Sequence, residues 1–290
     1  MKTVEVVVEE EIRLIDLIEK TFPNCSRTKR KEILEKRVVV ASRRISQFDY
    51  LLKKGSRVMF VGSDKENIPA HGRMPVVFED QWLLVVEKPV GLLSSSSNVG
   101  DITVISELNE MFAHRHSKNR AHVVHRLDRD TSGLLLVAKS KEIARELEKN
   151  WKETVFDRAY VALTWGTPSP KVGTIRSWLS DGEWGVVSSQ TENDGKLAIT
   201  HYKVLKNCGK WALVEMRLDT GRRNQIRVHM KDIGHPLLKD PIYGFREDSS
   251  PINRLALHAW RLGFCHPKTG KKIKLESEIP IEFKKIIGAQ

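Results

Sequence analysis

The sequence predicts an α+β fold: a large domain built on a mixed, mainly antiparallel sheet, preceded by a small basic unit. From Tyr160 onwards strand-like segments dominate and are broken by glycines. Before Tyr160, strand-like and helical segments alternate irregularly, which disfavours a doubly wound parallel sheet. Residues 63–75 are polar and contain two prolines, the composition of a linker. We therefore predict a first domain at 1–62 and a second at 76–290.

In the first domain, apolar spacing and turn residues predict two helices and several strands. The first helix ends at Pro23, and Ser26 is a suitable N-cap for the second. Lys54-Gly55 predicts a turn before the last strand. The predicted strands are 4–8, 38–40 and 57–61, and the predicted helices are 12–22 and 27–36.

Basic side chains crowd this domain, whereas acidic ones are few between positions 27 and 57. A solvated helix face is one interpretation. A clamp for backbone phosphates is the other, and we favour it because no counter-charge of similar density lies nearby. The residues that carry it are Arg27, Lys29, Arg30, Lys31, Arg43 and Arg44.

The second domain opens with predicted strands at 76–78 and 82–86. Asp101 is the expected N-cap of a helix with one apolar face over 104–112. Residues 133–138 form an apolar run that predicts a buried strand, and Ser140 is expected to begin the next helix.

Composition narrows the class of protein. The 290 residues are 40% hydrophobic and 30% charged, with a net charge of +12. This is a globular composition without an apolar run of the roughly 20 residues needed to cross a bilayer. The acidic start of the chain disfavours a signal peptide, so we expect a cytoplasmic protein. The positive charge favours a polyanion such as nucleic acid over a membrane as partner.

Several kinds of chemistry lack their motifs. Cys25, Cys208 and Cys265 lie far apart, which disfavours a disulfide framework and a cysteine-rich zinc site. The phosphate-binding, dinucleotide-binding and serine-hydrolase glycine motifs are absent. His114 and His116 have no further ligand at metal spacing, so a solvated or RNA-facing loop is favoured there. We expect no metal.

The densest polar cluster runs directly into the predicted strand at 133–138. In it Asp128 lies between Arg126 and Arg129. Nearby cations favour an ionised carboxylate, so this aspartate is expected to be charged at neutral pH. On spacing alone, a turn held by an Arg–Asp ion pair is favoured over a catalytic group.

A second cluster surrounds Gly221. Arg222, Arg223 and Arg227 flank this predicted turn, which is expected to lead into a strand of alternating character. One arginine could bind a carboxylate bidentately while others bind phosphates. An ordinary basic β-turn explains the residues equally well.

Together these clusters resemble the RluA-type pseudouridine synthases. His125–Lys139 is similar to the central motif of that family, Asp219–His229 to its third motif, and Arg158–Gly166 to its tyrosine-containing strand. Flanking matches follow in the family's order, from about Val76 to Pro280: Val86–Leu92, Gly195–Tyr202, Gly234–Gly244 and Leu257–Leu262. The first domain resembles the S-four type (αL) RNA-binding domain that often precedes this catalytic domain.

The resemblance implies isomerisation of uridine to pseudouridine in RNA, without metal or organic cofactor. Asp128 matches the family's essential aspartate, and Tyr160 would stack on the flipped base. Arg222 would pair with Asp128, Arg126 would help to extrude the nucleotide, and Ile226 would pack beside the base. Further candidates for contact with RNA are His125, Arg129, Arg223 and Arg227.

The sequence departs from the family at Glu87, at Ser94 to Ser97, and at Arg223-Asn224, where asparagine, a Val-His-Pro-like stretch and Thr-His are usual. We expect these sites to border the RNA rather than the reacting base. The predicted substrate is structured RNA, ribosomal or transfer, bound by a monomer without DNA or membrane partners. The alternative is a non-catalytic RNA-binding or ribosome-assembly protein with the same fold.

Overall fold

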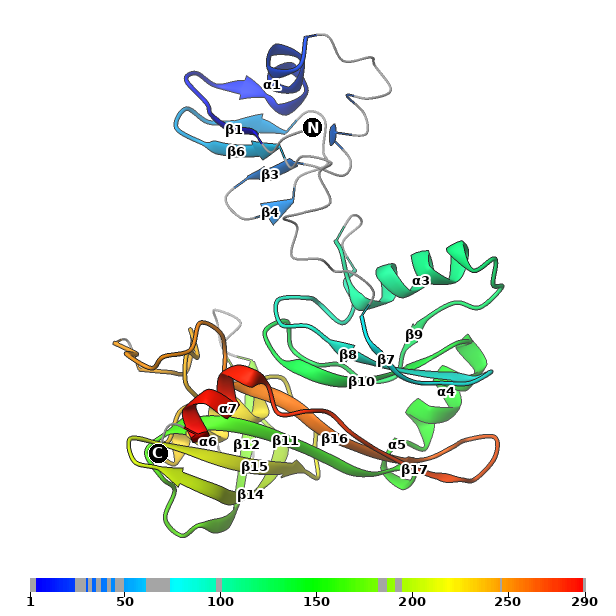
Figure 1. Cartoon of the computed structure of the whole chain (residues 1–290), viewed down its shortest axis with the longest axis vertical. Coiled ribbons are helices and arrows are strands. Elements are labelled where there is room, and N and C mark those ends of the chain that lie inside the picture. The colour runs from blue at the N-terminus through cyan, green and yellow to red at the C-terminus, as the bar shows by residue number, and fades with distance from the viewer. Residues whose placement is uncertain are drawn as a thin grey trace. The chain divides into compact units, whose positions relative to one another are not determined.

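A computed structural model describes the chain at 4–23, 30, 33–34, 38–40, 43–44, 50–60, 74–97, 101–181, 187–190, 195–245 and 247–288. It divides into two compact units (Figure 1). The first contains 1–73 with 96–101, and the second contains 74–95 with 102–290. Most of the predicted helix at 27–36 and the predicted linker up to residue 73 lie outside the described residues.

The described part of the first unit contains helix α1 (Leu14–Thr21), helical residues at 30 and 33–34, and two small sheets. Their strands follow the orders β1-β6-β3-β4 and β2-β5. Residues 12–13 form a strand instead of the first helical turn, because they pair with 51–52. The elements are β1 (Val4–Val7), β2 (Ile12–Arg13), α1 (Leu14–Thr21), β3 (Val38–Val40), β4 (Arg43–Arg44), β5 (Leu51–Leu52) and β6 (Arg57–Phe60).

The second unit is built on one sheet, in which eleven described strands take part. The main path is β13-β12-β14-β15-β11-β16-β10-β8-β7, with β17 on β16 and β9 on β10. Every pairing is antiparallel except β10 with β16, which confirms the predicted α+β class. The strands are β7 (Val76–Glu79), β8 (Leu83–Lys88), β9 (His122–Val123), β10 (Ser132–Ala138), β11 (Val155–Trp165), β12 (Val172–Asp181), β13 (Val187–Gln190), β14 (Lys196–Cys208), β15 (Trp211–Leu218), β16 (Leu257–Cys265) and β17 (Lys272–Glu276).

Strand β10 is buried along its whole length, as predicted, because helices cover both of its faces. Leu135 and Val137 belong to the same core cluster as the apolar side of α3 (Val104–His114). Leu134 and Leu136 pack with Ile143, Ala144 and Leu147 of α4 (Lys141–Lys149). The continuous apolar run therefore reflects a strand between two layers of helix.

The two helix starts differ in how well the sequence predicted them. Ser140 caps α4 as expected, since its hydroxyl accepts from the Ile143 N–H. The predicted cap at Asp101 is wrong: Thr103 caps α3 and forms a reciprocal capping box with Ser106. The Asp101 side chain instead accepts from Ser96 at 2.6 Å. Asp and Thr are both good N-caps, and the local sequence does not separate them.

The predicted strand after Gly221 is wrong, because these residues form helix α6 (Gln225–Asp232). Ile226 and Met230, four positions apart, pack into the core cluster that contains Tyr160. Val228 belongs to a different cluster, with Leu179. In so short a segment, apolar residues on two sides of a buried helix give the same alternation as a strand.

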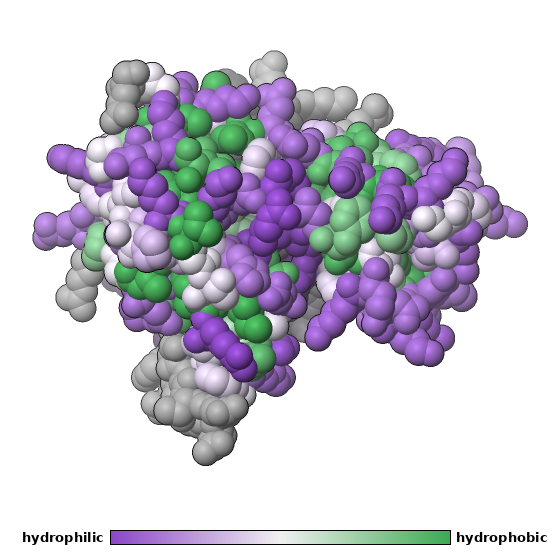
Figure 2. All heavy atoms as spheres, turned by 90° about the horizontal axis from the view of Figure 1, so that it is seen from below, coloured by the Kyte–Doolittle hydropathy of each residue, from purple (hydrophilic) through white to green (hydrophobic). Residues whose placement is uncertain are grey.

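The remaining helices are α5 (Trp151–Thr154), which leads directly into β11, and α7 (Ile281–Gly288). Phe283 and Ile286 of α7 pack with Val161 and Leu163 of β11. No described helix has the length and apolarity to cross a membrane. On the face shown in Figure 2, hydrophilic side chains separate a number of small apolar patches.

A close backbone approach fixes where β10 begins. Gly133 has φ +111, and a Cβ there would lie 2.2 Å from the Ala259 carbonyl oxygen. It lies on the short parallel stretch between β10 and β16. Only glycine fits such a position, and the turn that carries Asp128 comes immediately before it.

Candidate active site

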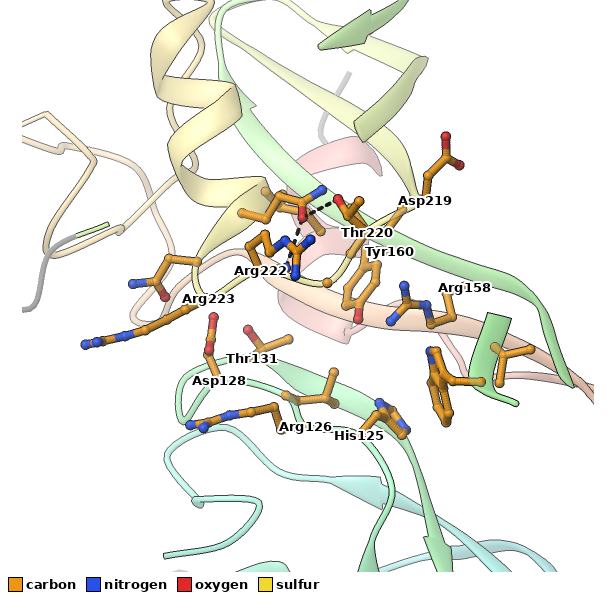
Figure 3. Close-up of a pocket in the computed structure, with 18 of the residues that line it drawn as sticks. His125, Arg126, Asp128, Thr131, Arg158, Tyr160, Asp219, Thr220, Arg222 and Arg223 are labelled. Atoms are coloured by element: carbon orange, nitrogen blue, oxygen red, sulfur yellow. Dashed lines mark hydrogen bonds between the residues drawn. The ribbon is translucent and has the colours of Figure 1, made fainter. Parts of the chain in front are cut away.

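One cleft of about 830 Å³ gathers the residues of both polar clusters. Its walls come from the turn before β10, from α5 and the start of β11, and from the segment that joins β15 to α6. Figure 3 shows Asp128 and Tyr160 entering this cavity from opposite walls, with Arg222 beside them. The structure thus brings together positions that lie about ninety residues apart in the sequence.

The Asp128 turn is held by a buried lysine. Lys88 is fully buried, and its Nζ donates to the carbonyl oxygens of Arg129 (2.9 Å), Leu92 (2.6 Å) and Pro89 (2.9 Å). Burial lowers the pKa of Lys88 to about 8. The turn also closes on itself, because the Thr131 N–H donates to the Asp128 carbonyl at 3.1 Å. Lys88 therefore connects the end of β8 to the residue after Asp128.

Ser94 holds the residue before Asp128. Its buried hydroxyl donates to the Leu127 carbonyl at 2.8 Å and accepts from the Leu127 N–H at 3.0 Å. The expectation that residues 94–97 border the RNA is therefore wrong for Ser94. Glu87 also differs from expectation: it accepts from Ser277, which contacts the buried His258. Lone serine and lysine residues near strand ends carry no periodic signal, so their contacts with the Asp128 turn could not be predicted from the sequence.

Burial and arginines act in opposite directions on Asp128. Burial, the largest effect, raises the pKa of the carboxyl above its ordinary value. The charges of Arg227, Arg126 and Arg223, with the backbone N–H of Asn224, lower this pKa and offset part of the rise. The adjacent arginines led us to expect a charged carboxylate at neutral pH. The structure adds the opposing effect of desolvation, which moves the pKa above its ordinary value despite these charges.

Arg227 is fixed by a buried ion pair. Its guanidinium donates to both carboxylate oxygens of Asp240 at 2.7 Å, and lies 5.1 Å from the ring centroid of Tyr243. It also donates to Asn224 Oδ1 at 2.9 Å. With a side chain only 6% exposed, Arg227 acts on Asp128 through its charge rather than as the RNA contact we expected.

Arg222 does not pair with Asp128 in the structure. Its Nε donates to the Leu197 carbonyl at 3.0 Å, and its backbone N–H donates to Gln225 Oε1 at 3.0 Å. Gln225 also accepts from Thr220 at 2.8 Å, so this buried amide shapes the turn. The exposed Arg222 side chain lines the cleft. The electrostatic role expected of Arg222 falls instead to Arg227, which the helix brings beneath the turn.

Tyr160 and Ile226 provide the apolar part of the cleft. Both are buried, lie in one core cluster and line the cavity. Burial raises the pKa of the Tyr160 hydroxyl; Arg158 lowers it and Asp128 raises it. The phenol therefore keeps its proton at neutral pH. This arrangement provides a flat apolar surface and a hydroxyl facing the Asp128 wall.

His125 is neutral and has a defined tautomer. Burial and the charge of Arg158 lower its pKa to about 3. The Leu136 N–H donates to Nε2 at 3.0 Å, so the ring proton lies on Nδ1. Among the described residues, Nδ1 has no hydrogen-bond partner. His125 therefore contributes no charge to the cleft and keeps one buried N–H without a partner among the described residues.

The other predicted cations occupy different positions. Arg126 and Arg223 line the cleft and are exposed, and Arg223 forms an ion pair with Asp181 at 3.3 Å. Arg129 is exposed and contacts Asp130 at 3.4 Å. Because exposed pairs are weak, these side chains can exchange such partners for phosphates.

In the first unit, Arg30 forms an ion pair with Glu19 and donates to the Pro23 carbonyl at 3.0 Å. It is therefore not the free cation that we expected there. Arg43 and Arg44 form the short strand β4. Arg27, Lys29 and Lys31 lie outside the described residues.

Comparison with known proteins agrees with this geometry. Residues 82–232 match the family model described as RNA pseudouridylate synthase. The chain belongs to this family. The match contains Lys88, Asp128, Tyr160 and α6, and covers every residue of the cleft lining except Leu257. This RNA pseudouridine synthase is an enzyme that isomerises uridine to pseudouridine in RNA.

Curated relatives of this pseudouridine synthase extend over most of the chain. The RNA pseudouridine synthase YlyB of Bacillus subtilis is 33% identical and covers 99% of this chain and 98% of its own length. The ribosomal large subunit pseudouridine synthase D of Zymomonas mobilis is 37% identical over 73% of each chain. That of Nitrosomonas europaea is 30% identical over 99% of this chain and 88% of its own.

Solved structures show that the pseudouridine synthase fold is shared. Human RNA pseudouridylate synthase domain containing 4 has a TM-score of 0.61 and 22% identity, over 73% of this chain and 91% of that one. Human RNA pseudouridylate synthase domain containing 1 has a TM-score of 0.57 and 27% identity, over 71% and 83%. The predicted fold class is therefore confirmed.

Proposed function

We propose that the enzyme modifies uridine in large-subunit ribosomal RNA, with Asp128 as the reacting group. The observation that carries this is the carboxylate of Asp128, buried in an arginine-lined cleft beside the ring of Tyr160. Several relatives named as ribosomal large subunit enzymes support the choice of RNA. We expect the enzyme to work in the cytoplasm as a monomer.

The reaction needs one carboxylate and a uracil ring that is held in place while it is detached. Uracil must leave the ribose through nitrogen, turn and rejoin it through carbon. The Asp128 carboxylate can attack the sugar or base covalently, or remove a ribose proton. Tyr160 would stack on the base while its hydroxyl relays a proton. Arg227, Arg126 and Arg223 would keep the carboxylate ionised against the effect of burial.

The target uridine must be extruded from the RNA helix or loop to reach Asp128 in the cleft. Flipping costs a few kcal/mol, and least where the nucleotide is poorly paired. Arg126 is exposed at the cleft next to Asp128, so it would fill the gap left by the extruded base. Ile226 would pack beside the base.

The test maps pseudouridine across ribosomal RNA in cells with and without this gene, followed by complementation. Asp128→Asn should bind RNA with unchanged affinity but lose at least about 10²–10⁴-fold of the turnover, because an amide is neither nucleophile nor base. The matched control is Asp130→Asn, which removes a carboxylate two residues away, paired with Arg129, and should restore the modification.

Retained turnover in purified Asp128→Asn would exclude the proposed role of this residue. Wild-type protein that binds the RNA without converting any uridine would instead favour the non-catalytic alternative. Modification confined to transfer RNA would contradict the proposed substrate but not the chemistry.

We also propose that the first unit binds RNA through its basic segment. Replacing Arg27, Lys29 and Lys31 by glutamine should weaken RNA binding and flatten the plot of log affinity against log salt by about 0.7–0.9 per lost phosphate contact. Arg30 is left intact because it pairs with Glu19. The control replaces three exposed lysines of the second unit, Lys171, Lys210 and Lys271. An unchanged salt slope would mean that the basic face is only solvated.

A further inference from the structure

The cleft continues past the groups that the reaction needs. Beyond Tyr160 its lining includes Trp151, Lys152, Phe156 and Arg158, at the junction of α5 and β11. We call these four residues the distal arm. The whole cavity, at about 830 Å³, lies near the upper end of the range of about 300–1,000 Å³ that holds a drug-sized ligand. One extruded base would leave the distal arm empty.

Arg158 is an unpaired cation held in place within this arm. Among the described residues its guanidinium has neither a carboxylate partner nor a hydrogen-bond acceptor, and the neighbouring Asp157 pairs with Arg217 instead. It lies 5.7 Å from the ring centroid of Trp151 on one side. On the other side, a Cβ at Gly221 would lie 3.3 Å from its Nη1, so the glycine leaves room for the guanidinium. Figure 3 shows the guanidinium directed into the cavity towards Tyr160.

A second donor in the same region also has no partner. The ring of His125 packs against that of Trp151, which Arg158 also contacts. The centroids of the two rings are 4.9 Å apart. The Nδ1 atom of His125 is buried and has no hydrogen-bond partner among the described residues. Buried polar groups in native proteins are nearly always bonded, and exceptions call for an explanation such as a ligand. His125 and Arg158 both contact the ring of Trp151.

The rim of the arm presents an exposed aromatic ring among cations. Phe156 is 42% exposed, and Lys272 Nζ lies 6.0 Å from its ring centroid. The absence of a side chain at Gly263 leaves room for the ring, since a Cβ there would lie 2.6 Å from its Cε2 atom. Lys152 and Arg158, which are close to Phe156 in the sequence, also line the cleft. Glu148 is the acidic residue that α4 and α5 contribute to this lining. An aromatic ring beside basic residues is the usual platform for an unpaired nucleotide.

We propose that the distal arm is a second nucleotide subsite, in which Arg158 binds a backbone phosphate next to the target uridine and Phe156 stacks on the neighbouring base. This inference rests on the proposed function, because it takes the substrate to be an RNA strand with an extruded uridine. The subsite would anchor the strand on one side of the extruded nucleotide, so that binding there helps to hold the flipped state.

The experiment uses a synthetic RNA hairpin carrying the uridine identified by the mapping above, with one neutral methylphosphonate linkage placed on either side of it in turn. Arg158→Gln should weaken binding by about 10- to 100-fold, as expected for a lost bond to a charged group, and raise KM while kcat changes little. In wild type, one of the two linkages should cause a similar loss. In Arg158→Gln that linkage should cause no further loss.

Two variants make the result specific. Arg176→Gln is the matched control, because Arg176 also lies 5.7 Å from a tryptophan ring, that of Trp178, but is outside the cleft lining; it should behave as wild type. Arg158→Lys should recover part of the affinity, because it keeps the charge but loses the planar fork. Thermal melts of each variant show whether the fold is intact.

The proposal would be overturned if each methylphosphonate linkage weakened binding to Arg158→Gln by the same factor as in wild type, because the two affinity losses would then be independent. A fall in kcat at unchanged KM would also overturn it, because Arg158 would then act through Tyr160. Failure of the proposed function has a different signature: wild type would not convert the unmodified hairpin, while the coupling between Arg158 and one linkage would still be measured by affinity.

Discussion

At the residue scale, the environment of Asp128 makes its ionisation depend on distant parts of the chain. Arg126 lies two positions before Asp128 in the sequence. Arg223 and Arg227 are far away in the sequence and come near Asp128 only because the turn after Gly221 and helix α6 place them there. These charges oppose the pKa rise caused by burial. The ionised fraction of the Asp128 carboxylate therefore depends on how many of these arginines are present.

This predicts a measurable pH effect. Arg126→Gln and Arg223→Gln should each raise the pKa of Asp128 further, so that the acid limb of kcat moves to higher pH. Each variant removes a charge that lowers this pKa in the wild type. Steady-state kcat measured between about pH 3 and pH 8, an interval that brackets the ordinary carboxyl pKa of about 4, would show the shift.

The control for this shift is Arg129→Gln. Arg129 is adjacent to Asp128 but contacts Asp130, and it is not among the charges that lower the pKa of Asp128. Its acid limb should stay at the wild-type position. Equal profiles for all three variants would contradict the electrostatic account.

At the element scale, the segment after β8 supports the turn before β10. Lys88 donates to the Arg129 carbonyl, Gly91 N–H donates to the same oxygen at 2.9 Å, and Ser94 brackets Leu127. Two strands that pair antiparallel thus place a loop from one against a turn of the other. The turn that carries Asp128 is therefore positioned by contacts to the backbone on either side of this residue.

Ser94→Ala tests this support. It removes both side-chain hydrogen bonds to buried Leu127 and should lower the free energy of unfolding by about 1–3 kcal/mol. Because the turn loosens, kcat should fall more than RNA affinity. Ser97→Ala is the control, since Ser97 is exposed in the same serine run. Chemical denaturation and single-turnover kinetics on both variants provide the measurements, and equal behaviour of the two would disprove the role of Ser94.

At the scale of the whole molecule, neutral histidines link stability to pH. Burial lowers the pKa of His229 and His258 to about 4, and that of His125 to about 3. All three are uncharged in the folded state at pH 5, whereas in the unfolded chain they bind protons below about 6.5. The unfolded state therefore binds more protons, and stability must fall as pH decreases from about 6.5 towards 4.

The predicted loss in the free energy of unfolding is about 1.4 kcal/mol per histidine for each pH unit below the pKa of the unfolded chain. Urea denaturation at pH 7 and at pH 5 should show the loss. In His229→Gln, which keeps a polar side chain near Thr200 and Ser177, the pH-dependent loss should shrink by one histidine's share. A free energy of unfolding that is equal at both pH values would contradict these pKa directions.

The sequence by itself determined the α+β class, the buried strand at 133–138, the cap at Ser140 and the two motifs that contain Asp128 and Arg222. These features depend on local periodicity, on capping chemistry or on long contiguous motifs, all of which are written in neighbouring residues. Only the tertiary structure decided that 225–232 is a helix, that Arg227 rather than Arg222 acts on Asp128, and that Lys88 and Ser94 hold the turn. Those outcomes depend on desolvation and on contacts between distant segments, and neither quantity exists until the chain is folded.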